Sequence, residues 1–598
     1  MDSLSSSFLS SIPQTKVPKI LNRNYYSSSL PRIYIYSVRT EDKPQTPTNS
    51  QNTKFPKPSS PLPHKSVPAK RYKTQSAPSP KPSLPSTFLN TLDDIINTFI
   101  DPPTRASLDP RFILSDNFAP VEELPPTECE IEEGVLPSCL DGAYIRNGPN
   151  PQFLPRGPYH LFDGDGMLHS IRISDGKAIL CSRYVQTYKY TLERQAGCNI
   201  LPSVFSGFNS LISSAARGSV SAARMIVGQF NPTNGIGSAN TSLAFFGNRL
   251  FALNESDLPY QVKLTPNGDI QTVGRNDFKG KLTMSMTAHP KVDLDTGEAF
   301  AFRYGPMPPF LTFFRFDSKG NKQPDVPIFS MSPSFLHDFA ITKKYAIFPE
   351  IQIGMKPSDM IIGGGSPVGL DPTKISRIGV IPRYATDERD MRWFEVPGLN
   401  LIHAINAWDE VNKDRHEAIV IVAPNIICAE HTLERMHLVH ALVEMIRIDL
   451  NTGVVTRQPL SARNLDFAVI NPDYVAKKNR YVYAAVGDPM PKITGVVKMD
   501  MSVAQDQREC IVASRMFGEG CYGGEPFFVA ARPDDPDADE DEGYLVTYVH
   551  DENKGESRFL VMDVKSPNLD VVASVKLPQR VPYGFHGLFV RDKDLKGL

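Results

Sequence analysis

Four histidines of this chain lie in short apolar segments whose composition is more typical of strands or strand ends than of helices. They are His289 in MSMTAHP, His337 in SFLHDFA, His403 in LIHAINAWDE and His586 in PYGFHGLFV. A neutral imidazole in such surroundings has two ring nitrogens to satisfy, and a metal ion can take one while an acceptor behind the ring takes the other. Each histidine taken alone is better explained as a hydrogen-bonded core residue than as a metal ligand. Together they make a metal site only if one fold brings four distant segments to one point.

The elements that would have to position these histidines are short strands separated by turn residues. Beyond about residue 110, alternating apolar residues are followed by Asp, Asn or Gly, which is typical of β-hairpins. Clear examples are segments 314–322, 446–455 and 544–564. Many hairpins in one long chain favour a β-propeller over a sandwich, although none of the usual fixed-length propeller repeats is present. Segment 432–445, with His437 and His440, has helical spacing, and we expect these two histidines to cap or pack rather than bind metal.

Composition excludes several classes of function. The 598 residues carry a net charge of −2, and no basic stripe marks a nucleic-acid partner. No uninterrupted apolar run reaches the roughly 18 residues of a membrane-spanning helix. The seven cysteines are scattered and never in CxxC spacing, which argues against a disulfide framework and favours a reducing compartment. No site for a nucleotide cofactor is recognisable.

The N-terminal region differs from the rest of the chain. Residues 1–40 contain ten serines, five Lys or Arg residues and a single acid, Asp2. This composition predicts an organelle transit peptide over residues 1–42, the alternative being a tail that is merely disordered. Residues 43–87 are rich in Pro, Ser, Lys and Thr and predict a disordered linker. The folded domain is then expected over residues 88–598.

Two segments predict helices that stand apart from the strands. In residues 87–100 six apolar residues recur at helical spacing on one face: Phe88, Leu92, Ile95, Ile96, Phe99 and Ile100. The second segment, 204–228, lies in a stretch from Ala196 to Asn254 that contains no Asp or Glu. Such surfaces suit the interface of a membrane, and the alternative is that both helices simply cover the propeller.

Several longer motifs, in order along the chain, carry a family resemblance. They are YIRNGPNPQF (144–153), HLFDGDGMLHSIRI (160–173), NESDLPY (254–260), LDFAVINP (465–472) and CYGGEPFFV (521–529). With the four histidine contexts, they resemble the carotenoid cleavage dioxygenase family of plants. FIDPPTRASLDPRF (99–112), SFLHDFAIT and ARNLDFAVINP resemble its plastid type-four branch. The resemblance extends from about residue 88 to the C-terminus.

The resemblance implies a fold and a metal site. The fold is an all-β, seven-bladed propeller with a dome of loops and helices over an axial site, where the four histidines bind Fe(2+). Three acids are implied behind the imidazoles: Glu255, Asp466 and Glu525. Other members carry Glu at the middle position, so we expect a longer or water-mediated contact from the shorter Asp466. Residues beside these motifs are expected to line an apolar substrate cavity, unless they are ordinary core: Phe162, Ile402, Phe467 and Phe585.

The resemblance also implies an activity. The enzyme would use O₂ to split a conjugated C=C bond of a carotenoid or apocarotenoid into two carbonyl products, with the 9,10 bond favoured over the 7,8 bond. The remaining alternatives are a stilbene substrate, isomerisation of a polyene, or a propeller that only binds carotenoid. The implied location is a plastid, with peripheral contact to a plastoglobule or thylakoid surface.

Overall fold

The computed structural model describes residues 84–101, 106–201, 203, 205–206, 210–355, 368–411, 415–432, 435–504 and 509–597. The predicted transit peptide and residues 43–83 of the predicted linker lie outside these ranges. Residues 84–87, which we expected in the linker, form the first turn of helix α1 (Leu84–Ile95). Pro85 is compatible with that turn, because the first N–H groups of a helix have no intrahelical acceptor.

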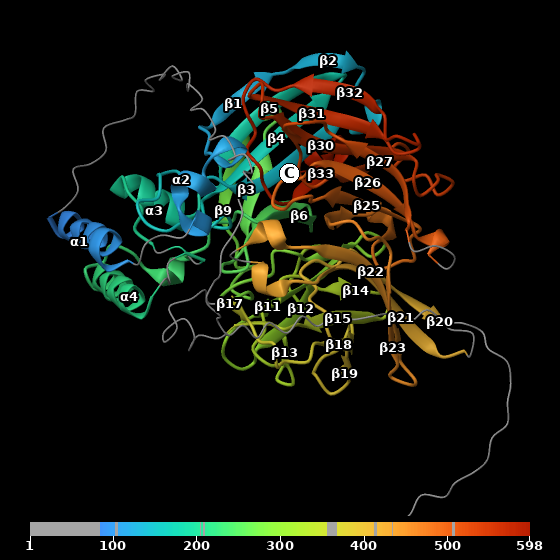
Figure 1. The fold of residues 1–598 in the computed structure, drawn as a ribbon, viewed down its shortest axis with the longest axis horizontal. Coiled ribbons are helices and arrows are strands. Elements are labelled where there is room, and N and C mark those ends of the chain that lie inside the picture. Colours follow the sequence, from blue (N-terminus) through green and yellow to red (C-terminus); the bar gives the residue numbers. More distant parts are fainter. Residues whose placement is uncertain are drawn as a thin grey trace, which may run out of the picture. The chain divides into compact units, whose positions relative to one another are not determined.

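The described strands build a seven-bladed β-propeller, as expected, and Figure 1 shows its sheets arranged around a ring. Five blades are antiparallel sheets of four strands taken in chain order. Their bounds are β6 (Ser242–Phe246), β7 (Arg249–Leu253), β8 (Tyr260–Leu264) and β9 (Ile270–Arg275); β10 (Lys291–Asp293), β11 (Glu298–Tyr304), β12 (Leu311–Phe316) and β13 (Val326–Ile328); β14 (Ala340–Ile341), β15 (Tyr345–Glu350), β18 (Arg377–Pro382) and β19 (Arg392–Glu395); β20 (Asn406–Val411), β21 (Glu417–Ile426), β22 (Ala441–Asp449) and β23 (Val455–Pro459); β24 (Leu465–Val469), β25 (Tyr481–Val486), β26 (Gly495–Asp500) and β27 (Ile511–Met516). A separate two-stranded sheet consists of β16 (Ile353–Met355) and β17 (Val368–Leu370).

The other two blades combine strands from both ends of the described chain, which closes the ring. In one of them the C-terminal strand β33 pairs with β3, and in the other the N-terminal strand β2 pairs with β32. The first blade contains β1 (Leu124–Glu128), β3 (Gly142–Pro149), β4 (Gly166–Ser174), β5 (Lys177–Tyr184) and β33 (Gly587–Arg591). The second contains β2 (Glu130–Gly134), β28 (Cys521–Tyr522), β29 (Phe527–Ala530), β30 (Gly543–Asp551), β31 (Glu556–Asp563) and β32 (Val571–Lys576).

The three predicted hairpins are present, and a common turn chemistry explains them. In the turn after β22, the Asp449 carboxylate accepts hydrogen bonds from the backbone N–H groups of residues 451 and 452. Asp317 after β12 and Asp551 after β30 bind the following backbone in the same way. A glycine with positive φ closes each turn, for example Gly453 with φ 75°. Aspartate and glycine therefore encode these turns locally.

The core consists of apolar layers between neighbouring blades. Phe302 on β11 and Phe313 on β12 meet Phe348 on β15 of the next blade, with ring centroids 6.0 and 5.5 Å apart. All three side chains are buried. Burying a large apolar side chain contributes roughly 1.5–3 kcal/mol, so these layers hold the blades to one another.

Helices lie mainly before the propeller strands and in the connections. The α-helices are α1, α2 (Pro110–Ile113), α3 (Tyr188–Ala196), α4 (Leu211–Ile226) and α6 (Asp592–Leu595). Helix α1 continues as the π-turn η1 (Ile96–Ile100). Short 3₁₀ turns are η2 (Ala106–Leu108), η3 (Asp116–Phe118), η4 (Ser138–Leu140), η5 (Pro232–Asn234), η6 (Ala429–His431), η7 (Met436–Leu438), η8 (Pro472–Tyr474) and η9 (Met501–Val503). Among the described residues, no helix combines the length and the apolar character that crossing a membrane requires.

The helix predicted over 432–445 is wrong. Residues 436–438 form a single 3₁₀ turn, and strand β22 begins at Ala441. From that residue to Asp449 buried and partly buried side chains largely alternate, and the strand pairs with β21 along its whole length. His440 lies just before this strand, where its Nε2 meets the carbonyl of Ala462 at 3.2 Å.

Helices α1 and α4 pack on each other, and two arginines bind them together. Leu89 and Ile96 are buried against Val220, and Leu92 and Ile100 join this cluster. Two ion pairs flank it, Arg224 with Asp93 and Arg217 with Asp101. The apolar face predicted for α1 is therefore divided, since Phe88, Ile95 and Phe99 remain exposed.

Candidate metal centre

Each of the four histidines lies just before a strand at the edge of a different blade. His289 is two residues before β10, His337 three before β14, His403 three before β20 and His586 one before β33. Such edge strands of neighbouring blades contact one another, for example β14 with β20 and β33 with β6. The propeller thus brings together residues that are almost 300 positions apart in the sequence.

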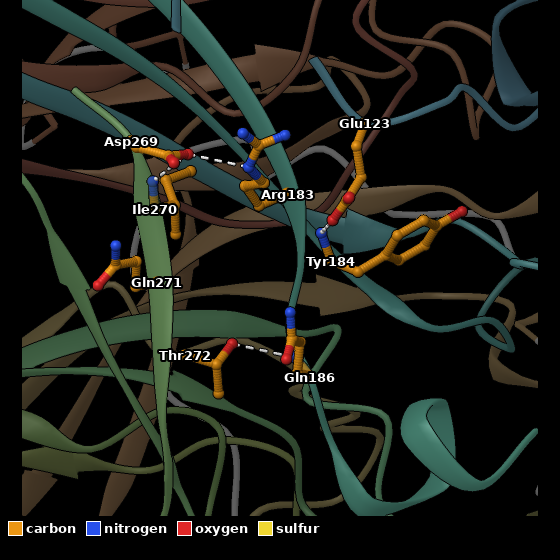
Figure 2. Close-up of a pocket in the computed structure, with 8 residues that line it drawn as sticks. All are labelled: Glu123, Arg183, Tyr184, Gln186, Asp269, Ile270, Gln271 and Thr272. Atoms are coloured by element: carbon orange, nitrogen blue, oxygen red, sulfur yellow. Dashed lines mark hydrogen bonds and ion pairs between the residues drawn. The ribbon is translucent and has the colours of Figure 1, made fainter. Parts of the chain in front are cut away.

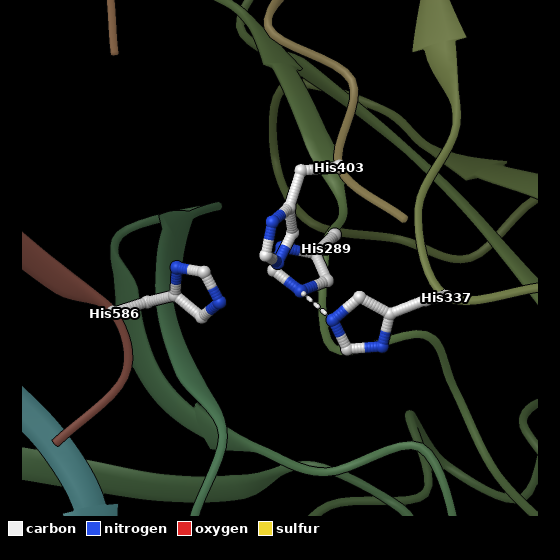
Figure 3. A group of neighbouring side chains, drawn as sticks. All are labelled: His289, His337, His403 and His586. Carbon is white, nitrogen blue, oxygen red and sulfur yellow. Dashed lines mark hydrogen bonds between the residues drawn. The ribbon is translucent and has the colours of Figure 1, made fainter. Parts of the chain in front are cut away.

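The four imidazoles converge on one point (Figure 3). One ring nitrogen of each lies within 4.8 Å of the corresponding nitrogen of every other, and the His289 and His337 Nε2 atoms are 3.0 Å apart. Two imidazoles bound at right angles to one ion, with metal–nitrogen bonds of about 2.1 Å, would have their nitrogens about 3.0 Å apart. The arrangement therefore fits a divalent metal ion held by neutral imidazoles.

Three of the four imidazoles meet a carboxylate at Nδ1, which leaves Nε2 for the shared centre. His403 Nδ1 is 2.8 Å from Asp466 Oδ1, and His586 Nδ1 is 2.9 Å from Glu525 Oε1. His337 Nδ1 contacts Glu255. Among the described residues His289 has no such carboxylate; its backbone N–H donates to Thr287 Oγ1 at 3.0 Å. The structure thus places all three predicted acids behind predicted ligands.

The contact of Asp466 differs from our expectation, because it is direct and as short as that of Glu525. Strand β24 contains a bulge between Asp466 and Val469, and Phe467 has φ 48°. Bulges redirect side chains and are frequent near active sites. Here the irregular backbone accompanies a short aspartate that reaches His403 without an intervening group.

Each acid has a second bond that fixes its orientation. Glu525 Oε2 accepts the backbone N–H of Gly587 at 2.8 Å, and Asp466 Oδ1 accepts that of Phe467 at 2.8 Å. Tyr304 donates its hydroxyl to Glu255 Oε2 at 2.6 Å. Burial, together with the nearby Glu255 carboxylate, raises the pKa of Tyr304 well above its usual range, so the phenol keeps the proton that it donates.

The pKa values of His289 and His403 are shifted in opposite directions. Burial, with the three neighbouring histidines, lowers the pKa of His289 well below its usual range, which keeps this ring neutral as a metal ligand requires. Burial acts in the same direction on His403, but the Asp466 carboxylate outweighs it and raises the pKa of His403. The Asp466–His403 pair therefore holds a proton at Nδ1, on the side away from the shared centre.

The four predicted lining residues lie in different surroundings. The ring of Phe467 is 5.5 Å from the rings of His403 and His586. Phe162 and Phe585 pack edge to face, with centroids 5.6 Å apart. Ile402, next to His403, instead packs against the apolar cluster that includes Ile351 and Ile426.

Two aromatic residues of the site, Tyr304 and Phe335, were not predicted from the sequence. Phe335 stacks on His337, with a centroid distance of 5.8 Å and an interplanar angle of 15°. It lies two residues before His337 in SFLHDFA, and alternate residues of an extended segment share a face. That spacing was the available signal.

A separate pocket of about 370 Å³ lies between β5 and β9, and none of its lining residues is one of the four histidines (Figure 2). Arg183 and Asp269 form an ion pair of 2.9 Å in it, and the Gln186 N–H donates to Thr272. These polar groups bind one another, so the pocket presents no comparable convergence of free ligand atoms.

Known proteins resemble this chain along most of its length. The family described as "Retinal pigment epithelial membrane protein" matches residues 118–591. A probable carotenoid cleavage dioxygenase 4 of Arabidopsis thaliana, described as chloroplastic, is 62% identical over 100% of both chains. A zeaxanthin 7,8(7',8')-cleavage dioxygenase of Crocus sativus is 55% identical over 61% of this chain and 99% of its own.

Solved structures share the fold. The lignostilbene dioxygenase of Pseudomonas brassicacearum superposes with a TM-score of 0.69 at 24% identity, covering 80% of this chain and 98% of its own. Family match, full-length identity and fold agree. The chain belongs to the RPE65 and carotenoid cleavage dioxygenase family of non-haem metal enzymes.

Proposed function

We propose that this protein is an Fe(2+)-dependent dioxygenase that cleaves one conjugated C=C bond of a carotenoid or apocarotenoid. One O₂ is consumed per bond, and one oxygen atom enters each of the two carbonyl products. The observation that carries the proposal is the convergence of four histidine nitrogens, three of them on rings held from behind by carboxylates. Four neutral ligands would leave a divalent ion its full charge, unlike the common site of two histidines and one carboxylate.

The side chains present indicate which part of the reaction the metal would supply and which part the protein would supply. Bound iron would supply the binding and activation of O₂. His289, His337, His403 and His586 would hold the ion, while Glu255, Asp466 and Glu525 orient their rings. Phe467, beside His403 and His586, would exclude water and support an apolar polyene. The protein's contribution would then be mainly positioning of one double bond.

For the position of cleavage we favour the 9,10 bond. A relative from Arabidopsis thaliana that is named carotenoid 9,10(9',10')-cleavage dioxygenase 1 is 39% identical over 87% of this chain. The Crocus relative named for the 7,8 bond makes 7,8 cleavage the main alternative. The substrate's depth in the cavity would select the bond, and Phe162, Phe467 and Phe585 are the side chains we expect to set it.

A single experiment tests the function. The full chain, purified anaerobically and loaded with Fe(2+), is given ¹⁸O₂ and a panel of carotenoids, apocarotenoids and a stilbene, and products are analysed by mass spectrometry. We expect stoichiometric iron and two labelled carbonyl products, both lost in His403→Ala. Bound iron with stilbene cleavage or isomerised polyene alone would replace the substrate assignment. Carotenoid binding without iron would indicate a binding protein.

We also propose that helices α1 and α4 contact a lipid surface from which the substrate is taken. Four large apolar side chains of this helix pair and of η1 are strongly exposed: Phe88 (64%), Phe99 (80%), Ile212 (70%) and Ile226 (85%). Single exposed apolar side chains are common on protein surfaces, but several on one packed helix pair suit an interfacial helix. Relatives named chloroplastic or chromoplastic support a plastid location, with a plastoglobule or thylakoid membrane as the surface.

A further inference from the structure

Three of the candidate ligands are positioned by strands that are not hydrogen-bonded to one another within a sheet. Strands β10, β14 and β20, which follow His289, His337 and His403, belong to three different sheets. Backbone hydrogen bonds within the sheets therefore do not fix their separation. Yet the spacing of the three Nε2 atoms depends on where these strands lie relative to one another, so another interaction has to set it.

A polar link, buried at Asp338 and partly buried at Lys291, joins these strands next to the ligands. Lys291 is two residues after His289, Asp338 directly follows His337, and Ala404 directly follows His403. The Lys291 ammonium lies 2.8 Å from Asp338 Oδ1 and donates to the Ala404 carbonyl at 3.1 Å. Asp338 Oδ2 in turn accepts the Ala404 N–H at 2.8 Å.

Both carboxylate oxygens of Asp338 accept hydrogen bonds. Besides facing Lys291, Oδ1 accepts the backbone N–H of Phe339 at 2.7 Å. The Asp338 side chain is only 3% exposed. It bonds to none of the four imidazoles in the described structure, so it differs from Glu255, Asp466 and Glu525. A hydrogen-bonded charge pair with a buried carboxylate is sensitive to geometry, because a displaced partner would leave that carboxylate unpaired.

We propose that Lys291 and Asp338 are positioning residues that set the spacing of the His289, His337 and His403 ligand nitrogens by clamping the first strands of three blades. The proposal rests on the proposed function, since it assumes that these histidines hold a metal. It predicts that loosening the clamp changes the metal's affinity and coordination while the blades remain folded.

The chain offers a closely matched control. Asp293, on the same strand as Lys291, is also buried and also bridges to the next blade, through Arg383 at 2.8 Å. It lies four residues from His289, at the other end of β10, and binds Lys343 at 3.3 Å as well. Asp293→Asn therefore removes a comparable charge pair between the same two blades without touching the residues adjacent to the ligands.

The experiment compares Asp338→Asn, Lys291→Met and Asp293→Asn in the full chain. An asparagine at 338 keeps the shape but turns an amide NH₂ toward either the Lys291 ammonium or the Ala404 N–H, which are both donors. Co(II) is titrated into each metal-free protein; its visible spectrum reports coordination geometry, and melting curves report the fold. We expect Asp338→Asn and Lys291→Met to shift the Co(II) bands and weaken binding about tenfold, the lower end of the effect of outer partners. Lys291→Arg, which keeps the charge, should restore part of the loss.

The outcomes separate the clamp from its alternatives. An unchanged spectrum and affinity in Asp338→Asn would overturn the proposal, as would equal changes in Asp293→Asn. Loss of the fold in both clamp variants but not in Asp293→Asn would assign the pair to stability and also overturn it. If the unmodified chain binds no Co(II) or Fe(2+), the proposed function fails instead, and this result is distinguishable from all of the others.

Discussion

At the scale of single residues, backbone shape compensates for side-chain length. The aspartate at 466 and the glutamate at 525 differ by one methylene, yet both carboxylates lie within 2.9 Å of an imidazole Nδ1. The positive φ of Phe467 and the bulge in β24 accompany the shorter acid. The length of the side chain alone therefore does not give the distance, because the backbone of the strand that carries it also contributes.

This geometry predicts equal importance for the two acids. Asp466→Asn and Glu525→Gln keep the shape but weaken the acceptor behind an imidazole N–H. We expect each change to reduce iron affinity by about 10–100-fold, as is typical for such partners. Iron titration with a competing chelator measures the effect. Asp473→Asn, an acid on η8 near Asp466 in sequence, serves as control. A much smaller loss in Asp466→Asn than in Glu525→Gln would show that the direct contact to His403 contributes little.

The residue types also explain how far the sequence could predict the site. All four histidines and three acids stand in motifs long enough to be recognised, and the structure gathers them. Lys291 and Asp338 lie beside two of those histidines, but their pairing depends on three blades meeting at one axis. No local sequence pattern shows that these three blades lie next to one another. Ile402 was predicted to line the cavity because it is adjacent to His403. Its side chain instead packs in an apolar cluster.

At the scale of elements, local chemistry decided what could be predicted. The hairpin turns follow from an aspartate and a glycine a few residues apart, and these were found. A helix was wrongly predicted over residues 432–445, because the apolar side chains there fit helical spacing as well as a strand. Pairing with β21 selects the strand, and that pairing is not visible in the segment itself. Tertiary context thus overrides a weak local preference.

The apolar residues of helices α1 and α4 fall into two groups, one buried between the helices and one exposed to solvent. Leu89, Ile96 and Val220 are buried between the helices, whereas Phe88, Phe99 and Ile226 are exposed. Replacing the exposed set Phe88, Phe99, Ile212 and Ile226 by serine should release the protein from liposomes, since each buried side chain contributes roughly 1.5–3 kcal/mol to binding. Cleavage of carotenoid in liposomes should fall, while cleavage of a shorter apocarotenoid in detergent should persist.

Two controls make this measurement specific. Val135, directly after β2, and Val411 on β20 are also strongly exposed, and their replacement by serine should leave flotation with liposomes unchanged. Ile96→Ser disturbs the packing between the helices and should lower the melting temperature instead. If the exposed-set variant still floats with liposomes, or if it loses both activities together with its stability, the membrane assignment is wrong.

At the scale of the whole molecule, the two ends of the folded region complete the ring. Strand β33 brings His586 to the centre and pairs with β3, while the His586 carbonyl accepts the backbone N–H of Asn147 at 2.9 Å. The fourth candidate ligand is therefore held by residues more than 400 positions earlier in the chain. This closure could not be predicted from hairpin patterns, because each hairpin is equally regular in a closed ring or an open array.

The region before the propeller leads to the last prediction. Residues 1–40 are serine-rich with a single acid, which is typical of a transit peptide, and helix α1 begins only at Leu84. Residues 1–83 can therefore be moved to a reporter without cutting a described element. Fused to a fluorescent protein, they should direct it into chloroplasts and be shortened by roughly 35–50 residues, as transit peptides are removed on import. Residues 84–598 without this leader should stay in the cytosol and still bind iron. Import of the shortened protein, or cytosolic fluorescence of the fusion, would refute a leader in this segment.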